Sequence, residues 1–380
     1  MDIVIVIFLI LLINAYLVKL FVSNFPARSE SYLWLLFSVH FLLTIAYMLY
    51  SASSRSDSVS YYNKAYYAED AMVFFTSGTK FIGFLAYPFV QILGLSYYAV
   101  MLVFSFFGYL AIVAFYLTAV ENIQLPPTWN NLSPLELVFL LPNVHFWTSS
   151  LGKGSAITFG IGLFAFGLSR INRRFLITII GAFLIYMIRP HILLAIVIAS
   201  MLGLLLTNGG LKGYIKWSLI IIATVLFVYV SGDVLKFTDT DSLDITSSSS
   251  LSHRTLELTK ASSGIDINNY NFFFKMFTFW FRPLFFDGLG VLGILSSFEN
   301  LVCLFMAGAI IKGAVKSWSG WNGLFRILLF VFLLGSFILS QVTGNLGIAL
   351  RQKAQLMPFF FILYCKAISI PLTFKRNAQQ

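Results

Sequence analysis

Long apolar stretches separated by short polar connections run through almost the whole chain. An α-helix needs about 20 apolar residues to cross the hydrocarbon core of a bilayer, and shorter helices can cross when they are partly buried in protein. The pattern therefore predicts about eleven membrane-spanning helices, at 1–23, 31–51, 97–119, 134–149, 156–169, 175–188, 191–207, 217–231, 290–311, 327–343 and 355–373.

Two segments need a separate interpretation. The segment 79–95 is short and contains Pro88, which favours a re-entrant or interfacial helix over a full crossing. The opening segment begins with Asp2 instead of basic residues, and it ends without a small-residue cleavage site. It is therefore predicted to be the first span and not a signal peptide. No internal repeat is apparent, which argues against the duplicated design of many secondary transporters.

Composition points to the same class of protein. Of the 380 residues, 59% are hydrophobic and only 11% are charged, which is too little polar surface for a water-soluble globule of this size. We therefore expect an all-α polytopic membrane protein that forms a single transmembrane domain over 1–380. The formal net charge of +10 does not indicate a nucleic-acid partner, because the basic residues lie in short connections between apolar runs.

The connections fall into two groups by charge. One group carries many basic residues against the single acid Glu30, and the positive-inside rule places these connections in the cytoplasm. The N-terminus is then outside and the C-terminus is cytoplasmic. The basic residues of this group are Lys19, Arg28, Arg170, Arg173, Arg174, Lys212, Lys216, Lys312, Lys316, Arg326, Lys366, Lys375 and Arg376.

Two long connections, 52–78 and 232–289, fall on the outer side. The first mixes acids with tyrosines. This mixture suits a headgroup-level aromatic belt, and it equally suits a sugar site with rings for stacking and carboxylates for hydroxyls. The second begins as a serine- and aspartate-rich lid and ends in an aromatic segment typical of an interfacial helix. Asp239 and Asp241 in the lid are interpreted as solvated loop residues and not as a metal site.

A set of cations also maps to the outer side, where retained positive charge is not expected. We call it the outer cationic set. Arginine binds phosphate through two parallel hydrogen bonds and lysine adds a point charge, so the simplest ligand at this depth is a lipid-linked diphosphate. The candidate diphosphate-binding residues are Lys153, Arg189, His191, Arg254, Arg282, Arg351 and Lys353.

Each of these candidates also has a structural interpretation. Arg189 could pair with the buried acid Glu299. Lys153 could extend along apolar surface to reach water, although the flanking Gly152 and Gly154 would let backbone amides approach an anion. Capping, interface anchoring or packing could explain four other residues, which are His191, Arg351, His145 and Trp147.

Four blocks of the sequence carry a family resemblance: LPNVHFWTSSLGKGSAITFGIGLFAFGLSRINRRF, YMIRPHILLAI, FWFRPLFFDGLGVLGILSSFENL and GNLGIALRQKAQLMPFFFIL. They resemble bacterial polytopic proteins of surface-polysaccharide clusters, namely Wzy-like oligosaccharide-repeat polymerases and the GT-C class of integral-membrane glycosyltransferases. The resemblance covers most of the chain from Asp57 onward. It implies a GT-C-like fold in the bacterial cytoplasmic membrane, a polyprenyl-diphosphate-linked glycan and membrane lipid as partners, and contact with other polysaccharide-assembly proteins.

The resemblance also implies catalytic residues. In GT-C enzymes, an acid in the first long outer loop acts as general base or metal ligand, and Asp57 holds the matching place, with Asp70 and Glu69 as substitutes. No cofactor is required, and a divalent metal held by Asp57 and a phosphate is compatible with this role. Related chains are expected to carry an acid directly after Lys153, whereas this chain has Gly154, so the turn is predicted to bind an anion without catalysing.

The predicted function is glycan assembly at the outer membrane face, in which sugar units are transferred or polymerised from a polyprenyl-diphosphate-linked donor. The chain lacks HExxH, P-loop, GxSxG and Cys/His-cluster motifs, which argues against a zinc protease, a nucleotide hydrolase and a serine hydrolase. Two alternatives remain open. An arginine-lined cavity would also suit a transporter or flippase of a lipid-linked glycan, and the chain could be a non-catalytic membrane scaffold of an export machine.

Overall fold

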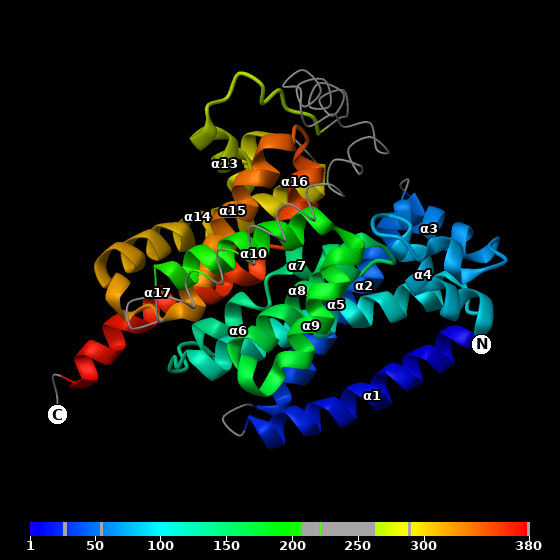
Figure 1. Ribbon diagram of the computed structural model, residues 1–380, viewed down its shortest axis with the longest axis horizontal. Coiled ribbons are helices and arrows are strands. Elements are labelled where there is room, and N and C mark those ends of the chain that lie inside the picture. Colours follow the sequence, from blue (N-terminus) through cyan, green and yellow to red (C-terminus); the bar gives the residue numbers. More distant parts are fainter. Residues whose placement is uncertain are drawn as a thin grey trace. The chain divides into compact units, whose positions relative to one another are not determined.

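The computed structural model describes residues 1–25, 29–53, 56–206, 217, 221, 263–287 and 290–377 (Figure 1). Over these ranges the chain forms helices and two isolated bridges, without a β-strand. Six helices are long and apolar enough to cross a membrane. The prediction of an all-α, multi-pass membrane protein is confirmed at this level, whereas the count of eleven spans and the GT-C-like fold stay predictions.

The long apolar helices coincide with the predicted spans. They are α1 (Asp2–Asn24), α2 (Glu30–Ser53), α5 (Tyr97–Asn122), α9 (Ile171–Ile188), α14 (Gly290–Ser317) and α15 (Gly323–Val342). Three further helices occupy predicted positions, namely α8 (Lys153–Ser169), α10 (Pro190–Leu205) and α17 (Met357–Asn377), whose apolar part is Met357–Ser369. The predicted span 217–231 lies largely outside the described residues.

The predicted span 134–149 is wrong as a single helix. It consists of two short helices, α6 (Pro134–Val138) and α7 (Pro142–Trp147). The break comes at Leu141, whose ψ of 131° is extended because the ring of the following proline disfavours the helical conformation. The segment 79–95 is short, as expected: α4 (Phe81–Tyr87) continues into a π-helical turn at Pro88–Ile92.

The chain divides into two compact units. Unit 1 comprises 1–122 and 126–189, and unit 2 comprises 123–125 and 190–380. The boundary falls at Arg189, which leaves the helical conformation before Pro190 with φ of −151° and ψ of 83°. The long apolar run around Arg-Pro-His is thus two helices, as predicted. Both units contain potential membrane spans, so the single transmembrane domain over 1–380 stays a prediction.

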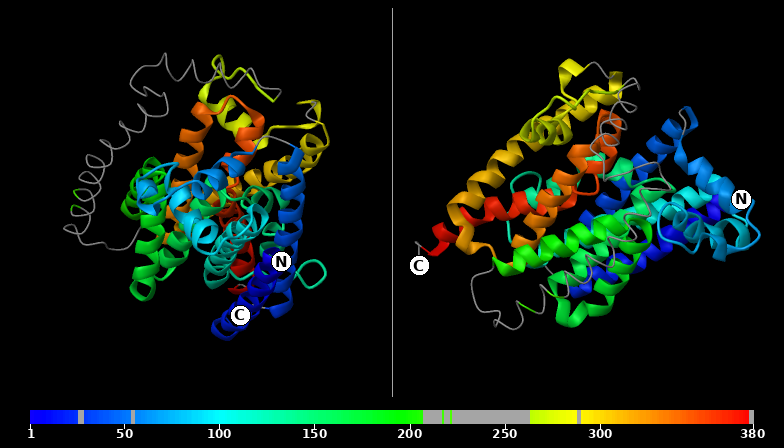
Figure 2. Two further views of the ribbon diagram at one scale, coloured as in Figure 1. Left: turned by 90° about the vertical axis from the view of Figure 1, so that its right-hand side faces the viewer. Right: turned by 45° about the horizontal axis from the view of Figure 1, so that its top comes forward.

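In unit 1, α5 is buried along most of its length and packs against α1, α2 and α8. Helices α8 and α9 form a closely packed pair (Figure 1, Figure 2). A Cβ added at Gly181 of α9 would lie 2.5 Å from the backbone nitrogen of Phe164 in α8. Small residues at such positions let membrane helices approach through their backbones.

The described part of the first long connection, 56–78, contains helical segments. It forms the amphipathic helix α3 (Asp57–Tyr66) and a 3-10 helix at Ala71–Phe74. The Tyr62 hydroxyl donates to the Leu95 carbonyl at 3.0 Å, which ties α3 to the residues that follow the π-helical turn. The connection is therefore a small helical layer at one end of unit 1.

In unit 2, α15 packs against α10, α17 and α13 (Phe272–Phe281), and α14 packs against α17. Helix α13 coincides with the predicted interfacial helix, and α16 (Leu346–Lys353) follows α15. The Arg326 guanidinium, which is 1% exposed, donates to the Leu206 carbonyl and, at 3.1 Å, to the Trp318 carbonyl. The end of α10 therefore lies beside the start of α15, so the two helices run antiparallel.

Candidate functional site

Two members of the outer cationic set lie at the same end of unit 1. Lys153 begins α8 and Arg189 follows α9, and these two helices form a hairpin joined at Arg170. The opposite end of the hairpin carries Arg174, whose guanidinium forms a salt bridge of 2.6 Å with Glu121 at the end of α5. The predicted cytoplasmic and outer basic residues of this hairpin are thus separated by the length of a helix.

Helix α3, which begins at Asp57, packs over the turn that precedes Lys153. A Cβ added at Gly152 would lie 3.3 Å from the ring of Tyr61. Asp57 and Tyr61 are four residues apart, so they share one face of α3. Asp57 itself is exposed at the start of the helix. The structure therefore brings the helix that carries the predicted base against the predicted anion-binding turn.

The turn at Lys153 contains the start of helix α8. Helix α8 begins after Gly152 without a hydrogen bond from a capping side chain, so its first N–H groups give this end a partial positive charge. A Cβ at Gly154 would lie 2.5 Å from the Trp147 carbonyl oxygen. This close approach explains why no acid follows Lys153, since any side chain there would collide with the backbone of α7.

The two substitute acids of the first connection are exposed. Asp70 caps the 3-10 helix, because its Oδ1 accepts from the Met72 backbone N–H at 2.9 Å. Glu69 takes part through its backbone, whose carbonyl accepts from the Tyr87 hydroxyl at 3.2 Å. Of the three predicted catalytic acids, Asp57 is the one whose helix packs on the Lys153 turn.

Arg189 lies next to the same connection. It is half-buried at the end of α9, and the backbone N–H of Gly78 donates to the Met187 carbonyl at 2.7 Å, two residues before Arg189. The end of unit 1 thus combines α3, the Lys153 turn and the end of α9.

In unit 2, as in the α8–α9 hairpin, the basic residues predicted to be outer and those predicted to be cytoplasmic lie at opposite ends. His191 begins α10, at the end of unit 2 opposite to Arg326, because α10 and α15 run antiparallel. Arg351 and Lys353 belong to α16, which begins shortly after α15 ends, and α16 packs against α13, which ends just before Arg282. His191 is exposed and Arg351 is half-buried. Four predicted ligand-binding residues therefore share one end of unit 2.

Arg282 is bound to a carboxylate of its own unit. Its guanidinium pairs with Asp287 through Nη2 and through Nε at 3.1 Å, and the Leu284 backbone N–H donates to the same carboxylate at 2.6 Å. The hydrogen bonds and charge of Asp287 raise the pKa of Arg282, with a smaller contribution from Tyr270. The pair organises the turn that leads from α13 to α14.

Lys353 is 1% exposed and is held by neutral oxygens. Its ammonium donates to the Asn300 amide oxygen and, at 3.1 Å, to the Trp280 carbonyl, while the Asn300 amide donates to the Pro283 carbonyl at 2.7 Å. Burial lowers the pKa of Lys353, and this effect is opposed by Cys303 and by Glu299 on α14. Lys353 and Asn300 thus hold the end of α13, so Lys353 lies behind Arg282 and not on the surface.

Six residues discussed from the sequence lie outside the described residues, namely Arg28, Lys212, Lys216, Asp239, Asp241 and Arg254. Within the described ranges, no three His, Cys, Asp or Glu side chains are grouped so that they could hold a metal ion.

Sequence reasoning missed His40, which lies on α2 and contacts His145 of α7 in the interior of unit 1. The available signal was a histidine inside the predicted span 31–51, a position where a polar side chain needs a buried partner. The partner could not be identified from the chain alone, because it is 105 residues away.

The comparisons with known proteins gave no matching family model, no matching curated protein and no matching solved structure. A function for this chain therefore rests on its own residues and their geometry.

Proposed function

We propose that this chain assembles glycans at the outer face of the bacterial cytoplasmic membrane, where it transfers or polymerises sugar units from a polyprenyl-diphosphate-linked donor. One observation carries the proposal. In unit 1 the uncapped start of α8 at Lys153, which favours an anion, lies under α3, the helix that begins with the carboxylate of Asp57. An anion site beside a carboxylate suits a reaction in which a diphosphate leaves and a hydroxyl attacks.

In this proposal, the donor diphosphate binds at Lys153 and at the first N–H groups of α8. Arg189, at the same end of unit 1, adds a second positive charge. The bond between the sugar C1 and the phosphate oxygen breaks, and these cations stabilise the negative charge that develops on the diphosphate. The acceptor hydroxyl forms the new bond to C1 and gives its proton to Asp57.

Unit 2 has cations of its own, which would bind an anionic group of a lipid-linked substrate. Arg282, Arg351 and His191 lie at one end of this unit. Asp287 offsets part of the charge of Arg282, and Arg351 is half-buried at the same end of the unit. Lys353 acts as a positioning residue, since it anchors the carbonyl of Trp280 two residues before Arg282.

The test uses the purified full chain with a polyprenyl-diphosphate oligosaccharide, and measures elongated glycan and released polyprenyl diphosphate. The wild-type protein is expected to form both products, and Asp57→Asn is expected to bind the donor without turnover. A matched control is Asp266→Asn, because Asp266 is an exposed acid in a turn of unit 2. Absence of product from every donor tried would contradict the proposal.

A carrier for lipid-linked glycans is the second candidate, because cations grouped at one end of apolar helices would also suit transport of an anionic lipid. A carrier needs no base, so Asp57→Asn should leave its transport rate unchanged in proteoliposomes. A scaffold would show neither activity, and Lys153→Gln or Arg351→Ala would change only its abundance. The Asp57 variant therefore separates the enzyme from a carrier, and the two wild-type assays separate both from a scaffold.

A further inference from the structure

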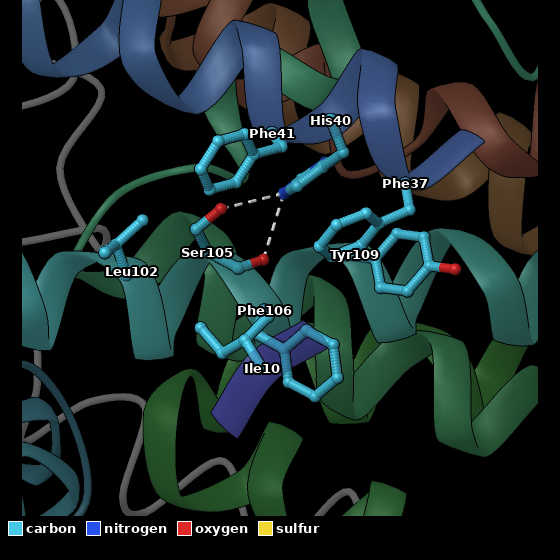
Figure 3. Close-up of a pocket in the computed structure, with 8 residues that line it drawn as sticks. All are labelled: Ile10, Phe37, His40, Phe41, Leu102, Ser105, Phe106 and Tyr109. Atoms are coloured by element: carbon cyan, nitrogen blue, oxygen red, sulfur yellow. Dashed lines mark hydrogen bonds between the residues drawn. The ribbon is translucent and has the colours of Figure 1, made fainter. Parts of the chain in front are cut away.

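Two histidines face each other in the interior of unit 1. His40 lies on α2 and His145 on α7, they are 2% and 0% exposed, and their Nδ1 atoms are 3.1 Å apart. The other ring nitrogen of each histidine reaches a backbone carbonyl. His40 Nε2 is 2.9 Å from the Ser105 oxygen, and His145 Nε2 is 2.8 Å from the Phe139 oxygen. Figure 3 shows His40 pointing at both oxygens of Ser105.

The neighbouring hydroxyl groups have acceptors other than the rings. The Ser149 hydroxyl donates to the His145 carbonyl at 2.6 Å, and the Thr44 hydroxyl donates to the His40 carbonyl at 2.8 Å. The Ser105 hydroxyl lies 2.6 Å from the Thr44 oxygen, shorter than its 3.1 Å distance to His40 Nε2. Each of the three hydroxyl protons therefore has an oxygen acceptor and does not need a ring nitrogen.

The contacts of the two rings need one more ring N–H group than two neutral imidazoles carry. A carbonyl oxygen only accepts hydrogen bonds, so the contacts to Ser105 and Phe139 require an N–H at Nε2 of both rings. A neutral imidazole carries a single N–H, so both Nδ1 atoms would present lone pairs to each other across 3.1 Å. Such a contact is repulsive. One additional proton converts it into a hydrogen bond between the two rings.

We propose that His40 and His145 form a proton-binding site, in which one proton is shared between their Nδ1 atoms. The site would place a single positive charge inside unit 1, spread over two rings. Charge-assisted hydrogen bonds at both outer nitrogens and at the centre would offset the loss of hydration. This site does not depend on the glycan chemistry proposed above.

The surroundings fit a proton better than a larger cation. Around His40, α1 contributes Ile10, α2 contributes Phe37 and Phe41, and α5 contributes Ser105 and the titratable phenol Tyr109, whose ring centroid is 6.0 Å from that of His40. A small pocket lined by these residues adjoins the ring (Figure 3). Zinc sites in proteins use three or four ligands, and within the described residues no third His, Cys, Asp or Glu joins the pair.

The experiment counts the ring N–H groups of the pair by nitrogen NMR of histidine-labelled protein. The other two histidines are removed as His191→Gln and His253→Gln, so that His40 and His145 give the remaining signals. Between pH 5 and 8, the proposal predicts an N–H at both Nε2 atoms throughout. It also predicts a third proton that couples both Nδ1 signals. This proton is either present at all these pH values or gained in one transition of both rings. A pair that holds only two protons over this whole range, with His40 Nε2 bare, overturns the proposal.

Two variants and a chelator treatment test the assignment of the third proton. Ser105→Ala removes the hydroxyl but keeps the carbonyl, so the third proton should remain. Its loss would show that His40 Nε2 depends on the Ser105 hydroxyl and not on the carbonyl. His145→Gln should leave His40 neutral, and an unchanged charged signal would show that the proton is not shared. Protein treated with a chelator should give the same signals as untreated protein, and a pattern that appears only after Zn²⁺ addition would identify a metal site and overturn the proposal.

Discussion

Lys153 and Lys353 were selected by the same argument, as cations in outer turns, and the two units use them differently. Lys153 is half-buried at the uncapped start of α8 and lies under α3. Lys353 is buried and bound to Asn300 and to the Trp280 carbonyl. The comparison teaches that charge placement along a helical chain predicts the helix end at which a residue lies. It does not predict whether the side chain reaches the surface or is buried in the protein interior.

The largest effect is expected at the end of unit 1 to which Lys153 belongs. Asp57→Asn removes the proposed base, and loss of a general base typically costs about 10²–10⁴ in rate. We expect the glycan-elongation rate to fall by this factor, with donor binding retained. If this variant elongates glycans at the wild-type rate, α3 has no catalytic role. If the elongation rate falls in Asp70→Asn or Glu69→Gln and not in Asp57→Asn, the base lies at the other end of the connection.

Lys153→Gln tests the same end through the diphosphate. Removal of a preorganised charge partner typically costs about 10²–10³ in rate. The melting temperature of the protein should change little, because Lys153 is partly exposed and Gln keeps a polar, unbranched side chain that is only slightly shorter. Lys64→Gln on the exposed side of α3 is the matched control and should keep the rate. Equal rate losses in both variants would indicate a general effect of charge and not a site at Lys153.

Asn300→Leu tests the structural use of Lys353. The substitution removes an acceptor from a buried ammonium and the donor to the Pro283 carbonyl. A hydrogen bond to a buried charged group contributes about 1.5–3 kcal/mol, so we expect the free energy of unfolding to fall by about 2–3 kcal/mol. Denaturant unfolding in detergent measures the change. Asn269→Leu, at an exposed position of the same unit, should have a much smaller effect; equal losses would mean that Lys353 does not depend on Asn300.

The smallest effect is a dependence of stability on pH. Burial lowers the pKa of Lys353 in the folded protein, so between this pKa and the usual value of 10.5 the unfolded chain binds more protons than the folded one. The free energy of unfolding should therefore rise with pH over this window, by at most about 1.4 kcal/mol per pH unit for one group. Unfolding curves of the wild type and Lys353→Met measure it. A slope that persists in Lys353→Met would assign the effect to another residue.

Much of the helical arrangement could be predicted because its causes are local. Apolar stretches of sufficient length became helices, and the proline in Arg-Pro-His ended α9 at Arg189, as expected from the residue that precedes a proline. The same local effect at Pro142 was overlooked, which is why 134–149 was predicted as one span. The residues needed for that correction were present in the chain.

Partners of the site residues could be predicted much less well. Arg282 and Asp287 are five residues apart in the chain, yet the sequence analysis did not pair them. In unit 2 Arg282 binds Asp287, and Lys353 binds Asn300. The pairing of Arg189 with Glu299 stays a prediction. A basic residue near a helix end can reach several acids, and the packing of α13, α14 and α16 selects among them.

The sequence by itself determined that this is an all-α membrane protein, where its main apolar helices run, and which basic residues share an end of each helical pair. These properties depend on hydrophobic length and on proline, which act over a few residues. Only the tertiary structure decided that Lys353 is buried, that Gly154 leaves no room for an acid, and that His40 meets His145. Such contacts join residues far apart in the chain, because they depend on how helix faces pack and not on the order of residues within a helix.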